Sequence, residues 1–410
     1  MKLLLVHPNF PGQFEHLVPA LLARGDELWA IRKPWNHSSS EHKNLKVLTY
    51  QIQRGNGQDT HPLALETESK VIRGEAAAHE AQRLQQSGTT PDLILGHPGW
   101  GDMLFLTDVW PQVPQLHYLE FFHGVPGTDN DIADRHATPQ TLHERQRTRM
   151  KNANLLLNLN QMTQGLTPTH FQRSVLPAWA QAKTRVIHDG INTEWLTPDP
   201  TAQLALANGS VLRAGDPVIT FVNRTFEPYR GIHVFLEALA LVQRQHPNAQ
   251  ALLVGADTPQ VSYGAHRRDG RGWLTALRQE LGDQLDWSRI HCVGTVAHTT
   301  LRQIYRVSAA HIYLTYPFVL SWSLLEALSC GCLVIGSGTA PVQEVIQHGH
   351  NGLLVPFQDA QQLAETMLQA LRHPQLMDPL RCQARLSVQP YALPRCLEQQ
   401  LALIDSIASA

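Results

Sequence analysis

The sequence predicts an α/β protein with two parallel-sheet domains, and three observations support this prediction. The chain has 410 residues, which is more than one hydrophobic core usually supports. Short apolar runs alternate with helical patterns along its length, and this alternation is typical of parallel strands joined by right-handed crossovers. A stretch rich in Pro, Gly and small polar residues at about 189–216 separates two such series, so we expect a domain boundary there.

Apolar runs predict the strands, and the amphipathic stretches between them predict the helices. In the first half the expected strands are 2–6, 27–31, 45–50, 92–95, 115–119, 155–159 and 185–187, and the expected helices include 14–23, 62–86 and 141–151. In the second half the expected strands are 218–222, 251–254, 289–293, 311–314, 333–335 and 352–355, and the expected helices include 232–245, 299–307, 324–329 and 360–371. The expected domains are therefore 1–195 and 196–394, followed by a last helix at 395–407.

Charge and cysteine usage restrict the class of partner and the compartment. The 33 basic and 35 acidic side chains nearly balance, so bulk charge gives no argument for nucleic acid. No run of eighteen apolar residues exists, and the apolar start of the chain is too short for the core of a signal peptide. The cysteines are odd in number and lie in apolar contexts, which favours a reducing, cytoplasmic location. They are Cys292, Cys330, Cys332, Cys382 and Cys396. Cys330-Gly-Cys332 lacks a second pair, so packing is favoured over a metal or redox role.

The most informative segment is 311–336, which has the pattern strand, loop, helix, strand. The first apolar run stops at Pro317, a turn with Ser321 and Ser323 opens the helix, and Gly331 ends it. Free N–H groups at such a helix start form a ready anion site. About one turn into the helix, Glu326 stands among apolar neighbours, where a carboxylate can accept hydrogen bonds from the vicinal hydroxyls of a ribose. The alternative is a solvated helix residue.

A second motif follows the first predicted strand of the second half, at 221–232. Arg224 and Arg230 flank a turn before a helix, and two guanidiniums at the mouth of a parallel sheet suit a diphosphate. The alternative is a pair of exposed cations. Cations are disfavoured near a helix N-terminus, so the presence of Arg230 there is best explained by an anionic ligand that it binds.

Three loops of the first half carry further candidates. Gly12 and Gln13 follow the first strand, where a glycine lets backbone N–H groups approach a phosphate, although a simple turn explains Gly12 equally well. Gly96 to Asp102 is a glycine-rich loop in which Trp100 can stack on a sugar face and His97 can meet a hydroxyl; a rigid turn is the alternative. The strand at 115–119 ends at Glu120, a candidate base or sugar contact; the alternative is a solvated residue at a strand end. His117 and His123 flank Glu120 and are further candidates to contact a sugar.

Two polar patterns are weaker. Asp129-Asn-Asp131 has the spacing of a D-x-D metal motif but lies in a polar loop rather than at the end of an early strand, so we expect no metal site there. Basic residues at 145, 147, 149 and 151 form a local stripe that can touch anionic lipid at the inner face of a membrane, although such a stripe is more often a solvated face.

The segment 311–336 resembles the nucleotide-sugar signature of retaining glycosyltransferases of family 4, which have the GT-B fold of two Rossmann-like domains facing a cleft. That signature has two glutamates eight positions apart, and Glu326 with Ala327 and Gly331 matches the second. The first position is Phe318, which leaves open what contacts the transferred sugar. Arg230-Gly231 stands where the family has Lys-Gly, and Asp189-Gly190 stands where it has Asn-Gly.

The resemblance implies retaining transfer of a sugar from a nucleoside diphosphate sugar to a hydroxyl acceptor, with no metal or other cofactor. The acceptor would be a sugar, a lipid-linked glycan or a small molecule. The resemblance also implies that helix 395–407 packs back on the first domain, and that Glu120 stands where relatives place a sugar-contacting His. The implied catalytic residues are Glu120, Arg224 and Arg230. The implied donor contacts are Gly12, Gln13, Asn223, Arg224, Arg230, Thr295, Val296, Leu320, Ser321, Trp322, Ser323 and Glu326, and the implied acceptor or sugar contacts are His97, Trp100, His117 and His123.

Two alternatives stay open. One is a nucleotide-sugar epimerase on the same fold. A phosphorylase on this fold would need a lysine for pyridoxal phosphate; it is disfavoured because the one lysine after residue 151, Lys183, lies near the domain boundary. The other is a degenerate sugar-nucleotide-binding protein, since Phe318 and Glu120 both depart from the family pattern.

Overall fold

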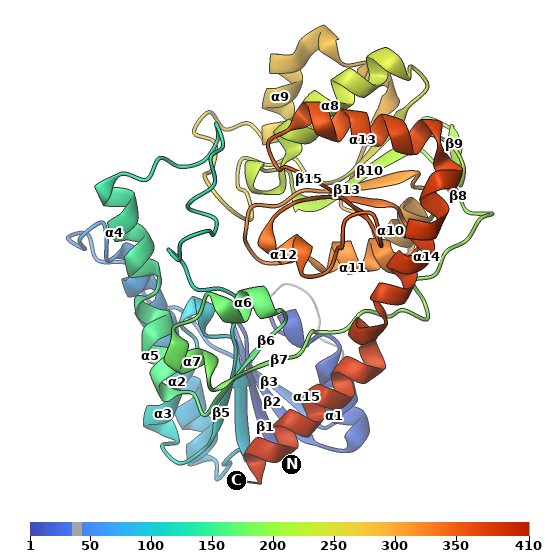
Figure 1. Ribbon diagram of the computed structural model, residues 1–410. Helices are drawn as coiled ribbons and strands as arrows, with labels where there is room; N and C mark the ends of the chain where they lie inside the picture. The colour runs from blue at the N-terminus through green and yellow to red at the C-terminus, as the bar shows by residue number, and fades with distance from the viewer. Residues whose placement is uncertain (35–42, 410) are drawn as a thin grey trace. The chain divides into compact units, whose positions relative to one another are not determined.

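The computed structural model describes residues 1–34 and 43–409, and these residues form two compact units (Figure 1). The first unit comprises Met1–Val125, Pro139–Gly190 and Leu393–Ala410. The second unit comprises Pro126–Thr138 and Ile191–Ala392. Each unit is a parallel sheet covered by helices, so the predicted fold class of two parallel-sheet α/β domains is confirmed.

The first unit is built on a parallel sheet with the strand order β3-β2-β1-β4-β5-β6-β7. Its strands are β1 (Lys2–Val6), β2 (Glu27–Arg32), β3 (Leu45–Thr49), β4 (Leu93–Gly96), β5 (Gln115–Tyr118), β6 (Gln164–Thr167) and β7 (Thr184–Val186). The chain winds from β1 outward to β3 and then returns to β4 beside β1. Strand β1 is apolar on both faces, as expected for a sheet that is covered on both sides.

Helices cover both faces of this sheet (Figure 1). The helices of this unit are α1 (Leu17–Arg24), α2 (Leu65–Gln86), α3 (Leu106–Val109), α4 (Leu142–Lys151), α5 (Ala153–Gln161), α6 (His170–Ser174), α7 (Ala178–Gln181) and α15 (Leu393–Ala408), and α4 lies outside the layers on the sheet. Leu3 and Leu5 pack in one core with α1 and α15, whereas Leu4 and Val6 pack in another with α2. Alternate side chains of β1 thus point to opposite faces of the sheet and belong to two separate hydrophobic cores.

The last helix, α15, is part of the first unit although it ends the chain. Leu403, Ile404 and Ile407 are buried in the core that contains α1, and Arg24 on α1 forms an ion pair of 2.8 Å with Asp405. The helix spans somewhat more than the predicted range 395–407.

The second unit has a parallel sheet with the order β12-β11-β10-β13-β14-β15. Its strands are β10 (Val218–Thr225), β11 (Gln250–Ala256), β12 (Ile290–Gly294), β13 (Ala310–Tyr313), β14 (Val334–Ser337) and β15 (Leu353–Val355). Its helices are α8 (Ile232–Gln245), α9 (Trp273–Leu281), α10 (His298–Arg306), α11 (Trp322–Ser329), α12 (Ala340–Gln343), α13 (Ala360–Arg372) and α14 (Asp378–Ser387). Helices α8, α9 and α13 cover one face, and α10 and α11 cover the other (Figure 1).

The structure departs from the predicted elements in three places. Residues 155–159, a predicted strand, lie in α5, because Leu is a good helix former and Asn158 donates to the backbone carbonyl of Asn154 one turn earlier. The strand at that position in the sheet is β6, which the sequence analysis missed. The expected linker contains an antiparallel hairpin of β8 (Gln203–Ala205) and β9 (Val211–Arg213).

The units also differ in extent from the expected domains. Residues Pro126–Thr138 belong to the second unit although they lie between β5 and α4 in the chain. Asp134 accounts for this placement, because its carboxylate lies 2.8 Å from the Nε2 of His233 on α8 and both side chains are buried. The change from the first to the second unit comes after Gly190, not after residue 195.

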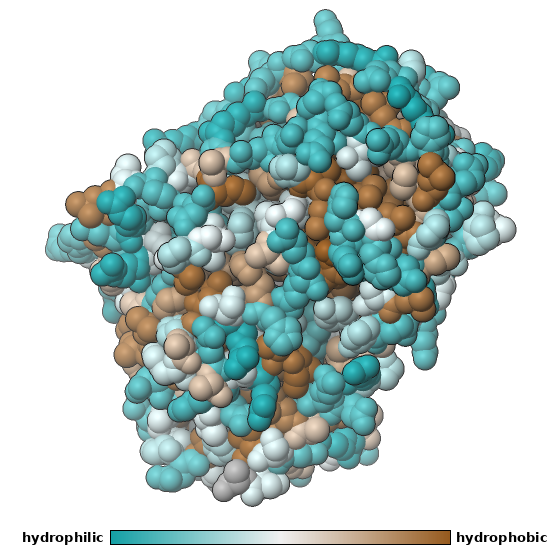
Figure 2. Space-filling model, in the orientation of Figure 1, coloured by the Kyte–Doolittle hydropathy of each residue, from teal (hydrophilic) through white to brown (hydrophobic). Residues whose placement is uncertain are grey.

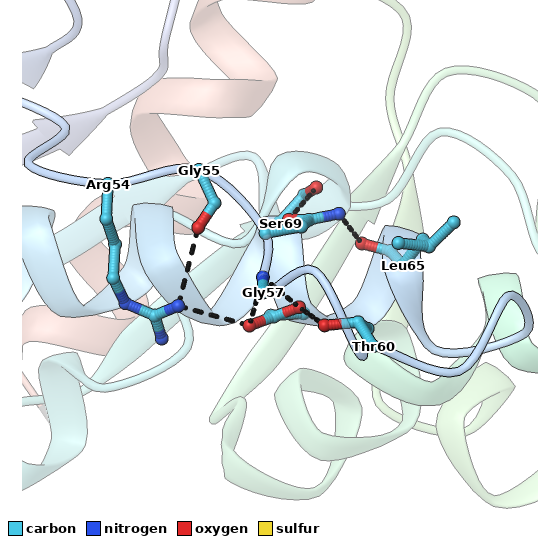
Figure 3. Close-up of polar contacts among 8 residues, drawn as sticks. Arg54, Gly55, Gly57, Thr60, Leu65 and Ser69 are labelled. Atoms are coloured by element: carbon cyan, nitrogen blue, oxygen red, sulfur yellow. Dashed lines mark hydrogen bonds and ion pairs between the residues drawn. The ribbon is translucent and has the colours of Figure 1, made fainter.

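The long loop between β3 and α2 is fastened to α2 by the carboxylate of Glu68 and by the side chain of Asn56, which donates to the Leu65 carbonyl and accepts from the Ser69 hydroxyl, each at 2.9 Å (Figure 3). Glu68 accepts hydrogen bonds from Arg54 at 3.1 Å, from the backbone N–H of Gly57 at 3.2 Å and from the Thr60 hydroxyl. These donors lower the pKa of Glu68, with the Thr60 hydroxyl contributing most. The loop is therefore held in place without a hydrophobic core of its own.

The molecular face in Figure 2 is mostly hydrophilic, with hydrophobic residues gathered in smaller patches. Among the described helices, none combines the length and the apolar character needed to cross a bilayer.

Candidate active site

Each sheet has a point at which the winding of the chain reverses, between β1 and β4 in the first unit and between β10 and β13 in the second. In open parallel sheets, ligands bind beyond the carboxyl ends of the strands at such a switch point. Most of the residues singled out in the sequence follow these strands. We describe the two switch points separately.

Arg230 is the central cation of the second unit's switch point. It lies in a short 3-10 turn after β10, and Gly231 then starts α8 with a left-handed φ of 70°. A Cβ on residue 231 would stand 2.6 Å from the Cβ of Leu314, so glycine is needed both for the angle and for the space. The turn therefore fixes Arg230 at the end of the sheet.

The guanidinium of Arg230 reaches across from β10 to the loop after β13. Its Nη1 donates to the Thr315 hydroxyl at 2.7 Å and to the Val319 carbonyl at 3.1 Å, and the group lies over the ring of Tyr263 at 5.2 Å. Arg230 is buried, so it is not the exposed cation of the alternative interpretation. These contacts orient the group and leave other N–H groups on it for an anion.

Arg224 is the second cation, at the carboxyl end of β10. Its side chain is exposed, and no hydrogen bond or ion pair joins it to another described residue. The two arginines thus differ: Arg230 is held in place, whereas Arg224 extends into solvent.

Glu227 lies between these arginines and was not singled out in the sequence. It is almost fully buried, and its Oε2 accepts hydrogen bonds from the Thr225 hydroxyl at 2.7 Å and from the N–H groups of Ser262 and Tyr263 at 2.8 and 3.1 Å. Burial raises its pKa. Glu227 therefore ties the loop after β11 to the end of β10 and places the Tyr263 ring under Arg230. An acid between two arginines in a strand-end motif was the available sequence signal.

The loop from β13 to α11 forms the other wall of this switch point. Ser321 caps α11, since its hydroxyl oxygen accepts the Ser323 N–H at 3.3 Å, and its own N–H donates to the Tyr313 hydroxyl at 2.8 Å. The partly exposed helix start includes Leu320, Ser321, Trp322 and Ser323. Phe318 is buried, with its ring 4.8 Å from that of Tyr263 and 5.7 Å from that of Tyr229.

Glu326 lies on the second turn of α11 and is mostly buried. The Tyr305 hydroxyl donates to its Oε2 at 3.3 Å, and Nε2 of His298 is 3.5 Å from its Oε1. It is therefore not the solvated helix residue of the alternative interpretation. Of the remaining candidates, Asn223 is half-buried near the carboxyl end of β10, and Thr295 and Val296 follow β12 at the far side of the sheet.

The first unit's switch point is made of imidazoles rather than guanidiniums. His7 follows β1 and is buried; its Nδ1 accepts the Asn9 N–H at 3.0 Å, and its Nε2 lies 2.7 Å from the Gln13 Oε1. Burial, followed by the neighbouring His97, lowers the pKa of His7 to about 3. Gly12 has a left-handed φ of 53°, and a Cβ there would collide with the His7 ring. Gly12 and Gln13 thus position His7.

His97 follows β4 and has the same local geometry. Its Nδ1 accepts the Gly99 N–H at 3.0 Å, and its Nε2 lies 3.4 Å from Oε2 of Glu120, which follows β5. The Trp100 ring lies 4.3 Å from that of His97 and 5.1 Å from that of His7. The structure therefore brings Glu120, His97 and Trp100 together, with Gln13 on the other side of His7.

The repeated geometry fixes the tautomer of both histidines. A ring nitrogen that accepts a backbone N–H carries no proton, so neutral His7 and His97 carry their proton on Nε2. The Nε2 of His97 lies near the carboxylate of Glu120 but makes no hydrogen bond within the described part of the chain. His7 was not singled out in the sequence, although His7-Pro8 and His97-Pro98 repeat the same pair directly after two strands.

Two predicted residues lie apart from this group. His117 points into the interior from β5, with no exposed surface; its Nε2 is 2.9 Å from the Gln115 Oε1, and burial lowers its pKa to about 3. His123 is anchored through its backbone, which exchanges hydrogen bonds with the Asn152 side chain, and burial lowers its pKa to about 4. For His117 the physical reason is strand alternation, which turns it away from the strand end.

The loop that holds His97 rests on a buried pair. The Tyr50 hydroxyl donates to Asp102 at 2.6 Å, and burial raises the pKa of Asp102. In the D-x-D-like loop, Asp129 accepts from the Tyr229 hydroxyl at 3.0 Å and Asp131 from the Gly127 N–H at 2.7 Å. No cluster of His, Cys, Asp and Glu suited to a metal ion occurs among the described residues.

Two family models match the chain, and together they cover most of it. Residues 24–196 match the model described as glycosyl transferase family 4 group. Residues 216–373 match the model described as glycosyl transferases group 1.

Curated relatives are similar over part of the chain. A trehalose synthase of Pyrococcus horikoshii is 26% identical over 47% of this chain and 44% of its own length. A D-inositol 3-phosphate glycosyltransferase of Jonesia denitrificans is 27% identical over 54% and 51%, and a phosphatidyl-myo-inositol mannosyltransferase of Mycolicibacterium smegmatis is 26% identical over 47% and 46%. The chain thus spans about half the length of these relatives.

Solved structures share the whole fold. Sucrose-phosphate synthase of Thermosynechococcus elongatus aligns over 100% of this chain and 99% of its own, with a TM-score of 0.74 and 22% identity. HepE of Anabaena, in complex with UDP and glucose, aligns over 99% and 100%, with a TM-score of 0.70 and 16% identity. These likenesses confirm the predicted GT-B fold class. The family is shown by the two family models, which together match residues 24–196 and 216–373: the chain belongs to the group 1 glycosyl transferases of the family 4 type.

Proposed function

We propose that the protein transfers a sugar from a nucleoside diphosphate sugar to a hydroxyl acceptor, with retention at the anomeric carbon. The observation that carries this proposal is the β10–β13 switch point, where Arg230 is oriented by Thr315 and Val319 beside the start of α11 and the exposed Arg224. Two guanidiniums and the N–H groups of a helix start suit a diphosphate better than any other common ligand.

The same unit would hold the rest of the nucleotide. Glu326, mostly buried with Tyr305 and His298 at its two oxygens, would accept hydrogen bonds from the ribose hydroxyls. The N–H groups near Ser321 and Ser323 would add to the charge stabilisation. These protein groups would supply the charge stabilisation themselves, so no cofactor would be needed.

In the transfer step, the bond between the anomeric carbon and the diphosphate oxygen breaks, and the acceptor oxygen bonds to the same carbon from the same face. The acceptor proton passes to the departing phosphate oxygen, so no protein nucleophile is needed. Charge builds up on the leaving diphosphate, and fixed positive groups placed there should supply most of the rate gain. Arg224 and Arg230 are the residues we assign to it.

We assign the first unit's switch point to the sugar and the acceptor. Glu120 with the Nε2–H of His97 beside it can hydrogen-bond a sugar hydroxyl or the attacking hydroxyl, and Trp100 offers a ring for a sugar face. HepE of Anabaena, whose structures hold UDP or UDP and glucose, lends support to a donor of this class.

The proposal is tested in two stages. A thermal-shift screen with UDP-glucose, UDP-N-acetylglucosamine, GDP-mannose and ADP-glucose should identify the donor, because a ligand at about 100 times its Kd stabilises by about 2.7 kcal/mol. Release of nucleoside diphosphate is then followed with a panel of sugar and polyol acceptors. Binding without turnover for every acceptor would favour a degenerate binding protein, and conversion of the donor sugar to its epimer would favour an epimerase.

A further inference from the structure

A separate cavity of about 560 Å3, wide open to the surface, lies in the first unit, along the outer edge of β7. Helix α6 contributes His170 and Arg173 to its lining, and α15 contributes Gln399, Ala402, Leu403 and Ser406 at the helical spacing of one face. The strand and the residue after it contribute residues 184–187, including Arg185. The volume is within the range of small-molecule sites.

The edge of β7 presents open backbone groups to this cavity. Ile187 donates its N–H to Thr167, and Lys183 accepts the N–H of Gly165, so the alternate residues 183, 185 and 187 bond to β6. The N–H and C=O groups of Thr184 and Val186 therefore point to the outer side, where no described residue bonds them. Beyond Val186, the Gln400 side chain on α15 donates to the His188 carbonyl at 3.0 Å and closes that end of the edge.

The charged groups at the cavity have one sign. Arg185 is exposed and forms no hydrogen bond or ion pair with another described residue. The Nε and Nη2 of Arg173 donate to the Gln181 carbonyl at 3.0 and 2.9 Å. These bonds fix the guanidinium and leave Nη1 available. None of the described residues that line the cavity is an Asp or a Glu. An anion is therefore favoured.

We propose that this cavity binds a small phosphate ester of a sugar or polyol. The guanidiniums of Arg173 and Arg185 and the outward N–H of Val186 would hold the phosphate, since arginine matches its geometry. The outward carbonyls of Thr184 and Val186, with the Gln399 amide and the Ser406 hydroxyl, would bind the hydroxyls. A ligand that carries both a phosphate and hydroxyls uses both sets of groups.

The cavity is distinct from the switch point of the same sheet. Strands in a sheet lie about 4.8 Å apart, so β7, three positions from β4, lies roughly 14 Å from it. None of the residues assigned to sugar transfer lines the cavity. The inference therefore does not depend on the proposed function.

Calorimetry on the full chain with glucose 6-phosphate as the probe tests the proposal. We expect Arg185→Gln to weaken binding at least tenfold, and Ala402→Trp to abolish it by filling the cavity. Lys183→Gln is the matched control, because it removes the same charge two residues away, directly before the strand, from an exposed residue outside the lining. This control should change the Kd less than twofold.

Glucose and inorganic phosphate are the further arms of the experiment. Each should bind at least tenfold more weakly than glucose 6-phosphate, because each uses one set of groups. The proposal is overturned if wild type does not bind glucose 6-phosphate at millimolar concentrations, or if either separate probe binds equally well. It is also overturned if Arg185→Gln and Lys183→Gln bind alike, because the phosphate ester would then be held elsewhere on the chain.

Discussion

At the β1–β4 switch point of the first unit the side chains are two imidazoles, an indole and one carboxylate, whereas at the β10–β13 switch point of the second unit they are two guanidiniums and a helix start. The two sheets have the same winding and the same kind of opening. The winding therefore decides where each site lies, and the residues that follow the strands decide what the site can bind.

The comparison extends to the way each site is held. In the second unit, the buried Glu227 links the loop after β11 to β10, and Arg230 links β10 to the loop after β13. In the first unit, His7 and His97 are each held by the N–H two residues ahead, so each ring is fixed by its own loop. The anion site thus depends on contacts between loops, and the imidazole site depends mainly on contacts within them.

The largest effect is expected from Arg230→Ala. The change removes a charged contact to the diphosphate, which typically costs about 1.5–3 kcal/mol, or roughly 10- to 150-fold in Kd. Calorimetry with the nucleoside diphosphate of the identified donor measures this. Arg244→Ala is the control, because Arg244 is an exposed cation at the other end of α8. Equal affinities for both variants would remove Arg230 from the diphosphate site; Arg224→Ala should show a smaller loss because its side chain is exposed.

Glu120→Gln should affect sugar transfer, which we assign to the first unit, and leave nucleotide binding by the second unit unchanged. We expect kcat to fall on the order of 10²-fold if Glu120 acts as an acid or base, with the Kd for the nucleoside diphosphate nearly unchanged. Transfer rate and diphosphate affinity are measured on the same variant, with Glu75→Gln on the exposed face of α2 as the control. Full activity would make Glu120 structural and turn attention to His97.

Acid should lower the free energy of unfolding, because the buried histidines bind protons more readily in the unfolded chain. Burial lowers the pKa of His117 to about 3 from an ordinary value near 6.5, so the unfolded chain binds more protons between these values. The contribution of His117 is complete above pH 6.5 and falls as the pH drops, by about 2 kcal/mol at pH 5. The free energy of unfolding measured by urea at several pH values should therefore depend less on pH in His117→Gln. His79→Gln, an exposed change on α2, should keep the wild-type slope; identical slopes for both variants would contradict the prediction.

Glu326→Gln should reduce the preference for a ribose over a deoxyribose. The neutral amide makes weaker hydrogen bonds to the two hydroxyls, so we expect the preference to fall about tenfold, or about 1.4 kcal/mol. The ratio of the Kd values for the ribo- and deoxyribonucleoside diphosphates measures it. Wild-type affinities for both forms would mean that Glu326 does not contact the ribose. Glu344→Gln, a change elsewhere in the same unit, is the control.

The smallest effect concerns the loop of Figure 3. Glu68→Gln should loosen the loop, because the amide replaces a carboxylate that accepts from Arg54, Gly57 and Thr60. Hydrogen exchange of the Gly57 amide should accelerate a few-fold, with exchange in β1 unchanged. The depressed pKa of Glu68 means that the same loosening should occur in wild type as the pH falls below its ordinary range near 4.5. A Gly57 amide as protected in Glu68→Gln as in wild type would show that the loop is held by other contacts.

The fold class and most strands follow from the sequence because most strands in these sheets are largely apolar runs between turns. The two strand errors have one physical reason. Residues 155–159 are as apolar as a strand, but four of the five are leucines, and Leu156 and Leu157 are exposed on a helix; β6 contains Gln164 and Gly165 and gives only a weak apolar signal. Gly165 is required there because a Cβ would stand 2.6 Å from the Thr184 hydroxyl of β7, a contact that only the folded sheet creates.

By itself the sequence determined the two sheets, the strand ends at which polar residues gather, and the cationic character of the second unit's motif. Tertiary structure decided which of those residues meet. It buried His117 inside its strand, placed His7 against Gln13, brought Arg230 to Thr315 across two strands, and joined Pro126–Thr138 to the second unit. The reason is that local patterns set which side of a strand a residue occupies, whereas contacts between loops depend on the strand order, which no single segment encodes.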